Sequence, residues 1–188
     1  EAYVKIGETP LAIKQIKNEA KILKLLHNKY HLSTISIPKC LYEGEIGDAY
    51  MLIQTPQPFE GKQGSKNFNK DYAKVINSLI EKTKVKRVFS ESLFYENLKA
   101  KIKDYLLSYK SILYKALNTL EKRIKDKEVF FSLSHGDFAP WNMQWYNGKV
   151  FLYDWESAFL EAPVGLDVVH FLFQTGFLLK RLKGKKLL

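Results

Sequence analysis

The chain has little cysteine and no long apolar segment. These two absences argue against a disulfide-stabilised protein and against a membrane-spanning protein. Cys40 is its single cysteine in 188 residues, so no internal disulfide can form, which fits a reducing compartment. No uninterrupted apolar run reaches the ~18 to 20 residues that a membrane-spanning helix needs, and no signal peptide is visible. We therefore expect a cytoplasmic protein with no membrane span.

Motifs of two hydrolase classes are also missing. The four histidines show neither HxH nor HExxH spacing, and Ser134 is not set in a G-x-S-x-G element.

The chain has 30 Lys and Arg against 20 Asp and Glu, which gives a net charge of +10 and would suit a polyanionic partner. No zinc spacing, basic helix or aromatic-basic RNA motif accompanies this charge. We predict a solvated basic surface and no nucleic-acid partner.

The chain does have enough apolar side chain for one core or for two small lobes, since 46% of its residues are hydrophobic and 14% are aromatic. Residues 59–70 are the best linker candidate, because they include two glycines and several polar residues. A boundary placed before them predicts a β-rich lobe over residues 1–57 and a mainly helical lobe over residues 58–188.

Apolar periodicity predicts the individual elements. In the first lobe we expect strands at residues 2–6, 35–42 and 49–54, a turn at 43–48, and a helix over 11–28. In the second lobe, three helices are marked by Tyr72, Val75, Ile76 and Leu79, by Phe94, Leu98, Ile102 and Leu106, and by Ile112, Leu113, Ala116, Leu117, Leu120 and Ile124. A strand at 129–133, a helix at 168–179 and a basic tail at 181–186 complete the pattern.

Glu19 is the unusual residue of the first helix. Its spacing from Ile16 and Leu23 places a carboxylate on or beside the apolar stripe. If that carboxylate is buried it must be paired, and Lys5 on the preceding strand is the nearest basic residue among apolar neighbours. From the spacing alone, a solvated Glu19 at the edge of the stripe is an equal alternative.

The strongest local signal is a hairpin at Asn147-Gly148, where both turn positions need positive φ. In this register Tyr146 faces Lys149, and Asn142 and Asp154 meet at the open end. A strict pleat would point the last two side chains to opposite faces. Their convergence therefore requires irregular backbone at that end, which a nearby proline favours.

Asp137 precedes Asn142 by five residues and can curl over the same end of the hairpin. Two carboxylates ~4 Å apart repel by roughly 4 kcal/mol at an effective dielectric of ~20, so such a cluster favours a bound cation. Aspartate and asparagine oxygens suit Mg²⁺, and an aspartate that is not bound to metal can accept a proton from a hydroxyl. His135 is a ligand, a base or a structural hydrogen-bonding group, and we favour the structural role.

The segment HGDFAPWN at residues 135–142 and the segment FLYDWE at residues 151–156 closely resemble two signatures of the aminoglycoside phosphotransferase and choline kinase-like family, H-G-D-x-x-x-x-N and I-D-W-E. The resemblance implies an α+β, protein-kinase-like bilobal fold. It also implies ATP- and Mg²⁺-dependent transfer of the γ-phosphoryl group to a hydroxyl of a small molecule. An aminoglycoside, a choline-like amine alcohol and a sugar are all open as the acceptor.

The same resemblance assigns roles to residues of the hairpin region. Asp137 would be the general base, and Asn142 and Asp154 would bind Mg²⁺. Glu156 would be at most an outer participant. Asp167 resembles the aspartate at a helix start that braces the catalytic loop, and an N-cap role is a compatible alternative.

In the first lobe, the resemblance makes Lys5 the phosphate-binding lysine and Glu19 its helix partner, which favours the paired reading of Glu19. Gln54 and Thr55 lie at the hinge, whose backbone would hold adenine.

Relative to the family, the chain is short at both ends. The strands and nucleotide-covering loop expected before Lys5, and the helices expected after Leu188, would lie outside it, so both lobes would be partial. Two alternatives stay open: the missing loop would suit a non-catalytic nucleotide-binding or scaffolding module of the same fold, and the net positive charge leaves a basic nucleic-acid-binding protein as the less favoured reading.

Overall fold

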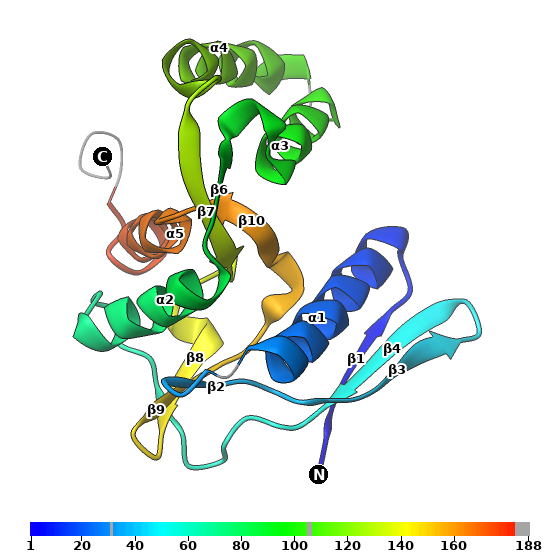
Figure 1. Ribbon diagram of the computed structural model, residues 1–188. Helices are drawn as coiled ribbons and strands as arrows, with labels where there is room; N and C mark the ends of the chain where they lie inside the picture. Colours follow the sequence, from blue (N-terminus) through cyan, green and yellow to red (C-terminus); the bar gives the residue numbers. More distant parts are fainter. Residues whose placement is uncertain (31, 105–106, 183–188) are drawn as a thin grey trace.

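The structure is a computed structural model that describes residues 1–30, 32–104 and 107–182 (Figure 1). Its strands and helices are interspersed along the chain in a mixed α+β order. They are β1 Tyr3–Gly7, α1 Pro10–Lys29, β2 Ile35–Ser36, β3 Cys40–Ile46, β4 Ala49–Gln54, β5 Lys62–Gln63, α2 Lys70–Thr83, β6 Val85–Val88, α3 Leu93–Asp104, α4 Leu107–Ile124, β7 Glu128–Ser134, β8 Met143–Tyr146, β9 Lys149–Leu152, β10 Phe159–Pro163 and α5 Leu166–Gln174.

The first sheet has the antiparallel order β1-β4-β3, and α1 lies beside it (Figure 1). Thr9 caps α1, since its Oγ1 accepts a hydrogen bond from the Ala12 amide, and Pro10 occupies the first turn. The predicted turn at 43–48 is wrong. Strand β3 continues to Ile46 because the hairpin closes in two residues at Gly47, whose φ is 57°.

A second sheet, with the order β2-β9-β8-β5, is built around the β8-β9 hairpin. Strand β2 comes from the N-terminal part of the chain and runs parallel to β9, whereas β5 comes from the segment before α2 and pairs with β8. The third sheet has the order β10-β7-β6. Of these three strands, the apolar pattern predicts β7, and it predicts neither β6 nor β10.

The helices agree with the apolar periodicity. The patterns beginning at Tyr72, Phe94 and Ile112 fall in α2, α3 and α4, and Leu106 lies outside the described residues. The helix predicted over 168–179 consists of α5 followed by a single π-helical turn, Thr175–Leu179. Residues 183–186 of the basic tail are also outside the described part. Within that part, no helix is both long and apolar enough to cross a membrane.

The largest core cluster joins α1, α2, α5 and the hairpin sheet. At its centre Phe171 of α5 is fully buried, with ring centroids 5.4 Å from Tyr72 and 5.5 Å from Phe68. Aromatic pairs at this centroid spacing stabilise the folded state beyond what the burial of their apolar area contributes. Helix α5 is thereby fixed against the elements that carry the polar residues described below.

Phe171 and Phe173 provide a matched test of this packing, because they lie two residues apart and Phe173 is about half exposed. Phe171→Ala should lower the free energy of unfolding in urea by ~3 to 5 kcal/mol, the usual cost of emptying a buried aromatic site. Phe173→Ala should cost less than ~1 kcal/mol. Similar losses for the two variants would contradict the burial pattern.

Candidate active site

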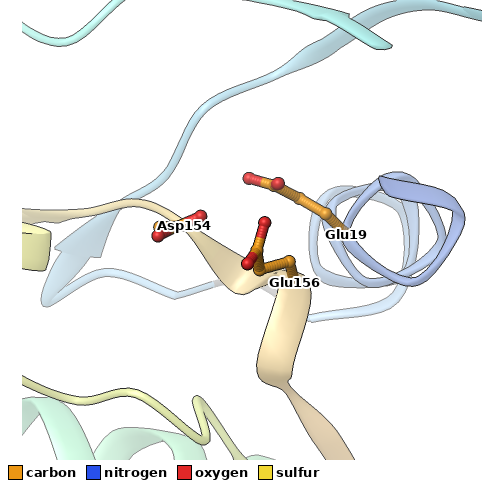
Figure 2. A group of neighbouring side chains, drawn as sticks. All are labelled: Glu19, Asp154 and Glu156. Atoms are coloured by element: carbon orange, nitrogen blue, oxygen red, sulfur yellow. The ribbon is translucent and has the colours of Figure 1, made fainter. Parts of the chain in front are cut away.

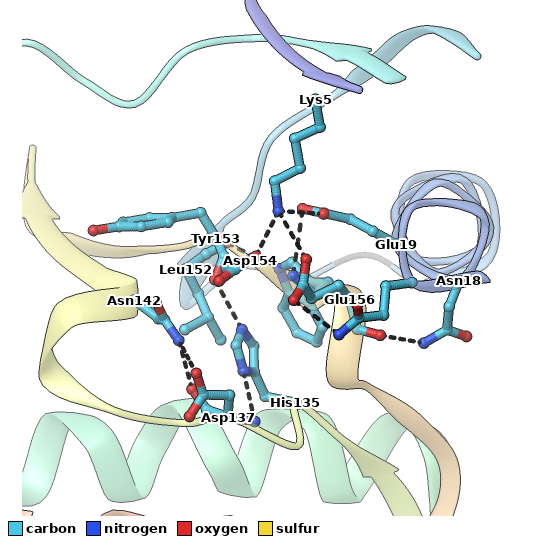
Figure 3. A network of polar contacts seen from close by, with 12 residues as sticks. Lys5, Asn18, Glu19, His135, Asp137, Asn142, Leu152, Tyr153, Asp154 and Glu156 are labelled. Carbon is cyan, nitrogen blue, oxygen red and sulfur yellow. Dashed lines mark hydrogen bonds and ion pairs between the residues drawn. The ribbon is translucent and has the colours of Figure 1, made fainter. Parts of the chain in front are cut away.

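The hairpin has the predicted register. Tyr146 pairs with Lys149 across a turn in which Asn147 and Gly148 have φ of 48° and 73°. Beyond its open end the pleat stops on both strands. Asn142 ends a short 3₁₀ turn, and Asp154 is left-handed, with φ of 68°. This irregularity removes the constraint that would separate the two side chains, and Figure 3 shows the Asn142 amide turned toward Asp137.

The loop that carries Asp137 is held by hydrogen bonds to Asp167. The buried Asp167 carboxylate accepts hydrogen bonds from Ser134 Oγ at 2.7 Å, from the His135 amide at 3.0 Å and from the Gly136 amide at 3.1 Å. The N-cap of α5 is Gly165, so the N-cap alternative for Asp167 is wrong. Its carboxylate braces the loop.

Gly136 is required by this loop for two reasons. Its φ is 79°, a region that disfavours side chains, and a Cβ atom there would lie 2.0 Å from the Ser157 carbonyl oxygen. The backbone before Asp137 therefore lies directly against the segment that follows Asp154.

His135 is fully buried and makes structural hydrogen bonds. Its Nε2 lies 3.0 Å from the Tyr153 carbonyl oxygen, and its Nδ1 accepts a bond from the Asp137 amide at 3.3 Å. These partners select the neutral tautomer with the proton on Nε2. Burial lowers the pKa of His135 and keeps the ring neutral. The ring therefore connects the Asp137 loop to the hairpin end.

The Asp137 carboxylate is held at both oxygens. Asn142 Nδ2 donates to Oδ2 at 2.7 Å, and His170 Nε2 lies 2.8 Å from Oδ1. The hydrogen bond from His170 is the main cause that lowers the pKa of Asp137, and the bond from Asn142 acts in the same direction. The carboxylate is therefore ionised at neutral pH.

His170 has no role that its local sequence predicts, and it is one of four histidines in the chain. Its contact with Asp137 joins residues 33 apart in the sequence. A usable signal was present in its spacing, because His170 lies three residues after Asp167 and therefore on the same side of a helix.

Lys5 is surrounded by carboxylates (Figure 3), and Figure 2 shows the three of them, Glu19, Asp154 and Glu156. Its Nζ lies 2.6 Å from Glu19 Oε2, 2.5 Å from Asp154 Oδ1 and 3.6 Å from Glu156 Oε2. Burial alone lowers the pKa of Lys5, but the charges and hydrogen bonds of Glu19 and Asp154 outweigh burial and raise it. The lysine is therefore fully charged.

Glu19 is buried and paired, so the solvated alternative is wrong. Its second oxygen lies 3.4 Å from the Trp155 amide, which donates to it. Burial raises the pKa of Glu19, and Lys5 partly offsets this rise. Glu156 is held at its side chain by Gln15, and its carbonyl oxygen accepts a bond from Asn18, so α1 contacts the hairpin end at several points.

Three carboxylates face one lysine in this cluster. Oxygens of Glu19, Asp154 and Glu156 lie within 4.8 Å of one another, and Lys5 supplies one positive charge against their three negative charges. An oxygen-rich donor set with excess negative charge suits Mg²⁺. Asp154 and Asn142 are the residues of this region that sequence analysis assigned to the metal.

Beside this cluster is a cavity of about 280 Å³, near the lower end of the range of small-molecule sites. Gln54 lines it, and Gln54 Oε1 is buried without a hydrogen-bond partner among the described residues. Thr55 also lines it, but its amide and its hydroxyl are both bonded to Lys39. The other lining residues are Tyr3, Lys5, Pro38, Gln57, Tyr153, Asp154 and Glu156.

Comparison with solved structures identifies similar folds. A thermostable mutant of aminoglycoside phosphotransferase APH(4)-Ia, in its apo form, has a TM-score of 0.64 at 16% identity over 95% of this chain and 67% of its own. The amicoumacin kinase hAmiN, in complex with AMP-PNP, Ca²⁺ and Ami, has a TM-score of 0.58 at 13% identity over 98% and 60%. A putative fructosamine-3-kinase from Haemophilus somnus 129PT has a TM-score of 0.56 at 16% identity over 94% and 64%.

No family model matches the sequence, and no curated protein matches it. The chain spans 60 to 67% of the length of the three solved chains described above. At this level of identity the likeness establishes the fold, and it confirms the α+β prediction. The chain has the protein-kinase-like fold shared by the aminoglycoside phosphotransferases and related small-molecule kinases.

Proposed function

We propose that the protein is an ATP- and Mg²⁺-dependent phosphotransferase that moves the γ-phosphoryl group to a hydroxyl of a small molecule. The observation that carries the proposal is the position of Lys5. Its Nζ bridges Glu19 of α1 and Asp154 at the end of the hairpin that also places Asn142 beside Asp137. A cation, metal-ligand oxygens and a candidate base are thereby brought together from four segments of the chain.

Lys5 would bind nucleotide phosphate, because it is the charged lysine that lines the cavity beside Asp154. Glu19 would hold the lysine in this position. Gln54 and Thr55 would lie against the nucleobase, and the unpartnered Gln54 Oε1 provides an acceptor there. Asn142 and Asp154 would hold Mg²⁺, which when bound neutralises charge on the phosphates.

Asp137 would accept the proton of the acceptor hydroxyl as the new oxygen–phosphorus bond forms and the bond to ADP breaks. Its lowered pKa keeps it ionised before the reaction. A carboxylate of low pKa is a weak base, which suits a phosphoryl transfer in which most catalysis comes from positioning and charge stabilisation.

The solved neighbours support nucleotide use. One APH(4)-Ia structure is a ternary complex with ADP and hygromycin B, and the hAmiN structure contains AMP-PNP and Ca²⁺. These ligands belong to those proteins, which are 13 to 16% identical to this chain and longer than it. The acceptor of this protein, whether an aminoglycoside, a choline-like alcohol or a sugar, is part of what is to be tested.

Asp137→Ala tests the base. In the full-length protein it should lower kcat for phosphoryl transfer by about 10²- to 10⁴-fold, the usual contribution of a positioned general base. The midpoint of urea unfolding should change little, because Asp137 is about one-third exposed. Asp126→Ala, which alters an exposed aspartate in a turn, is the matched control. Unchanged transfer in Asp137→Ala would remove Asp137 from this role.

Mg²⁺ dependence of ATP binding tests the metal ligands. ATP with Mg²⁺ at ~100 times its Kd should raise the free energy of unfolding by about 2.7 kcal/mol. ATP with EDTA should give a smaller increase, and Asp154→Asn should remove the difference between the two conditions. Equal stabilisation of the unaltered protein with Mg²⁺ and with EDTA would contradict the proposed site. Binding without any phosphoryl transfer would instead support a scaffolding module.

A further inference from the structure

His170 contacts the candidate base directly, although neither the motifs nor the comparisons assign it a role. Its Nε2 lies 2.8 Å from Asp137 Oδ1, and its side chain is 24% exposed. An ionised carboxylate can only accept hydrogen bonds, so His170 must carry a proton on Nε2 and donate it. This contact fixes the protonated nitrogen of the ring.

The two hydrogen bonds to the Asp137 carboxylate come from different elements. Asn142 holds Oδ2 from the 3₁₀ turn that precedes the hairpin, and His170 holds Oδ1 from α5. A single bond would leave the carboxylate free to rotate about its last side-chain torsion. Bonds to both oxygens from separate elements restrict that rotation.

Helix α5 also fixes the backbone beneath Asp137. Asp167, one turn before His170, accepts bonds from the amides of His135 and Gly136. Residues three apart lie on the same side of a helix, so Asp167 and His170 face the same loop. Asp167 holds the backbone of the loop, and His170 holds the Asp137 carboxylate.

The position of α5 is set by the core and not by these polar contacts alone. Phe171, which follows His170 directly, is fully buried against Tyr72 and Phe138. A helix anchored in this way can hold a neighbouring carboxylate to a defined position.

We propose that His170 is a positioning residue for Asp137, and that Asp167 and His170 together form a two-point brace from α5 to the catalytic loop. This inference rests on the proposed function. In the proposed reaction His170 acts through Asp137, because it keeps the Asp137 carboxylate oriented toward the acceptor hydroxyl. Misplacement of a reacting group by about 1 Å can cost about 100-fold in rate, so the contact should affect turnover more than nucleotide binding.

Three variants of the full-length protein test the proposal. His170→Phe keeps a ring but removes the donor. His170→Gln keeps a terminal N–H donor at a similar reach. Leu172→Ala is the control, since Leu172 is an exposed residue of the same helix and has no place in the site. Turnover is measured as ATP hydrolysis, with water as the acceptor, and thermal unfolding is followed for each variant.

His170→Phe should lower kcat by about 10- to 100-fold while KM for ATP stays within about twofold. His170→Gln should recover at least a third of the lost kcat on a logarithmic scale, and Leu172→Ala should behave as the unaltered protein. A merely structural role would not produce this split between kcat and KM, nor the rescue by glutamine.

The results that would overturn the proposal are distinct from failure of the proposed function. If the unaltered protein turns over ATP and His170→Phe does so at a kcat within about twofold of it, His170 does not position the base. If His170→Phe and His170→Gln lose kcat equally and unfold at equally lowered temperature, its role is structural. If the unaltered protein transfers the γ-phosphoryl group neither to water nor to any of the candidate acceptors, the proposed function fails and the role of His170 fails with it.

Discussion

The arrangement of the site depends on the ionic contacts of Lys5. Lys5 of β1 and Glu19 of α1 are both largely removed from water, and burial of the Glu19 charge is tolerable because Lys5 is paired with it. Asp154 completes the contact from the hairpin end. Three segments of the chain are therefore held at one point, and loss of the Lys5 charge would leave the buried Glu19 without its cation.

The second constraint is the anchoring of the Asp137 loop. Asp167 holds the backbone of this loop. His135, two residues before Asp137, is hydrogen-bonded to the hairpin end, and Gly136 allows the loop to approach Ser157 closely. None of these contacts involves a reacting group. They fix a carboxylate that is about one-third exposed on a short loop, where it would otherwise sample several orientations, and they do so from elements packed into the main core.

The sequence was sufficient for the features that depend on local chemistry. The Asn147-Gly148 turn set the hairpin register, and apolar spacing identified α1 and α2. It was insufficient where a contact depends on tertiary packing. Strand β6 is four residues long and mostly exposed, so it carries no alternation that could identify it. The burial of Glu19 and the contact of His170 depend on how distant segments meet, and spacing alone left the first open and gave the second no role.

A double-mutant cycle on nucleotide affinity tests most directly whether the Lys5–Glu19 contact holds the phosphate-binding group. Kd for ATP with Mg²⁺ is measured for the unaltered protein, Lys5→Met, Glu19→Gln and the double variant. Because Glu19 would act through Lys5, loss of Glu19 should matter little once Lys5 is gone, with a coupling of at least about 1.4 kcal/mol, or tenfold in Kd. Additive effects of the two substitutions would contradict the account.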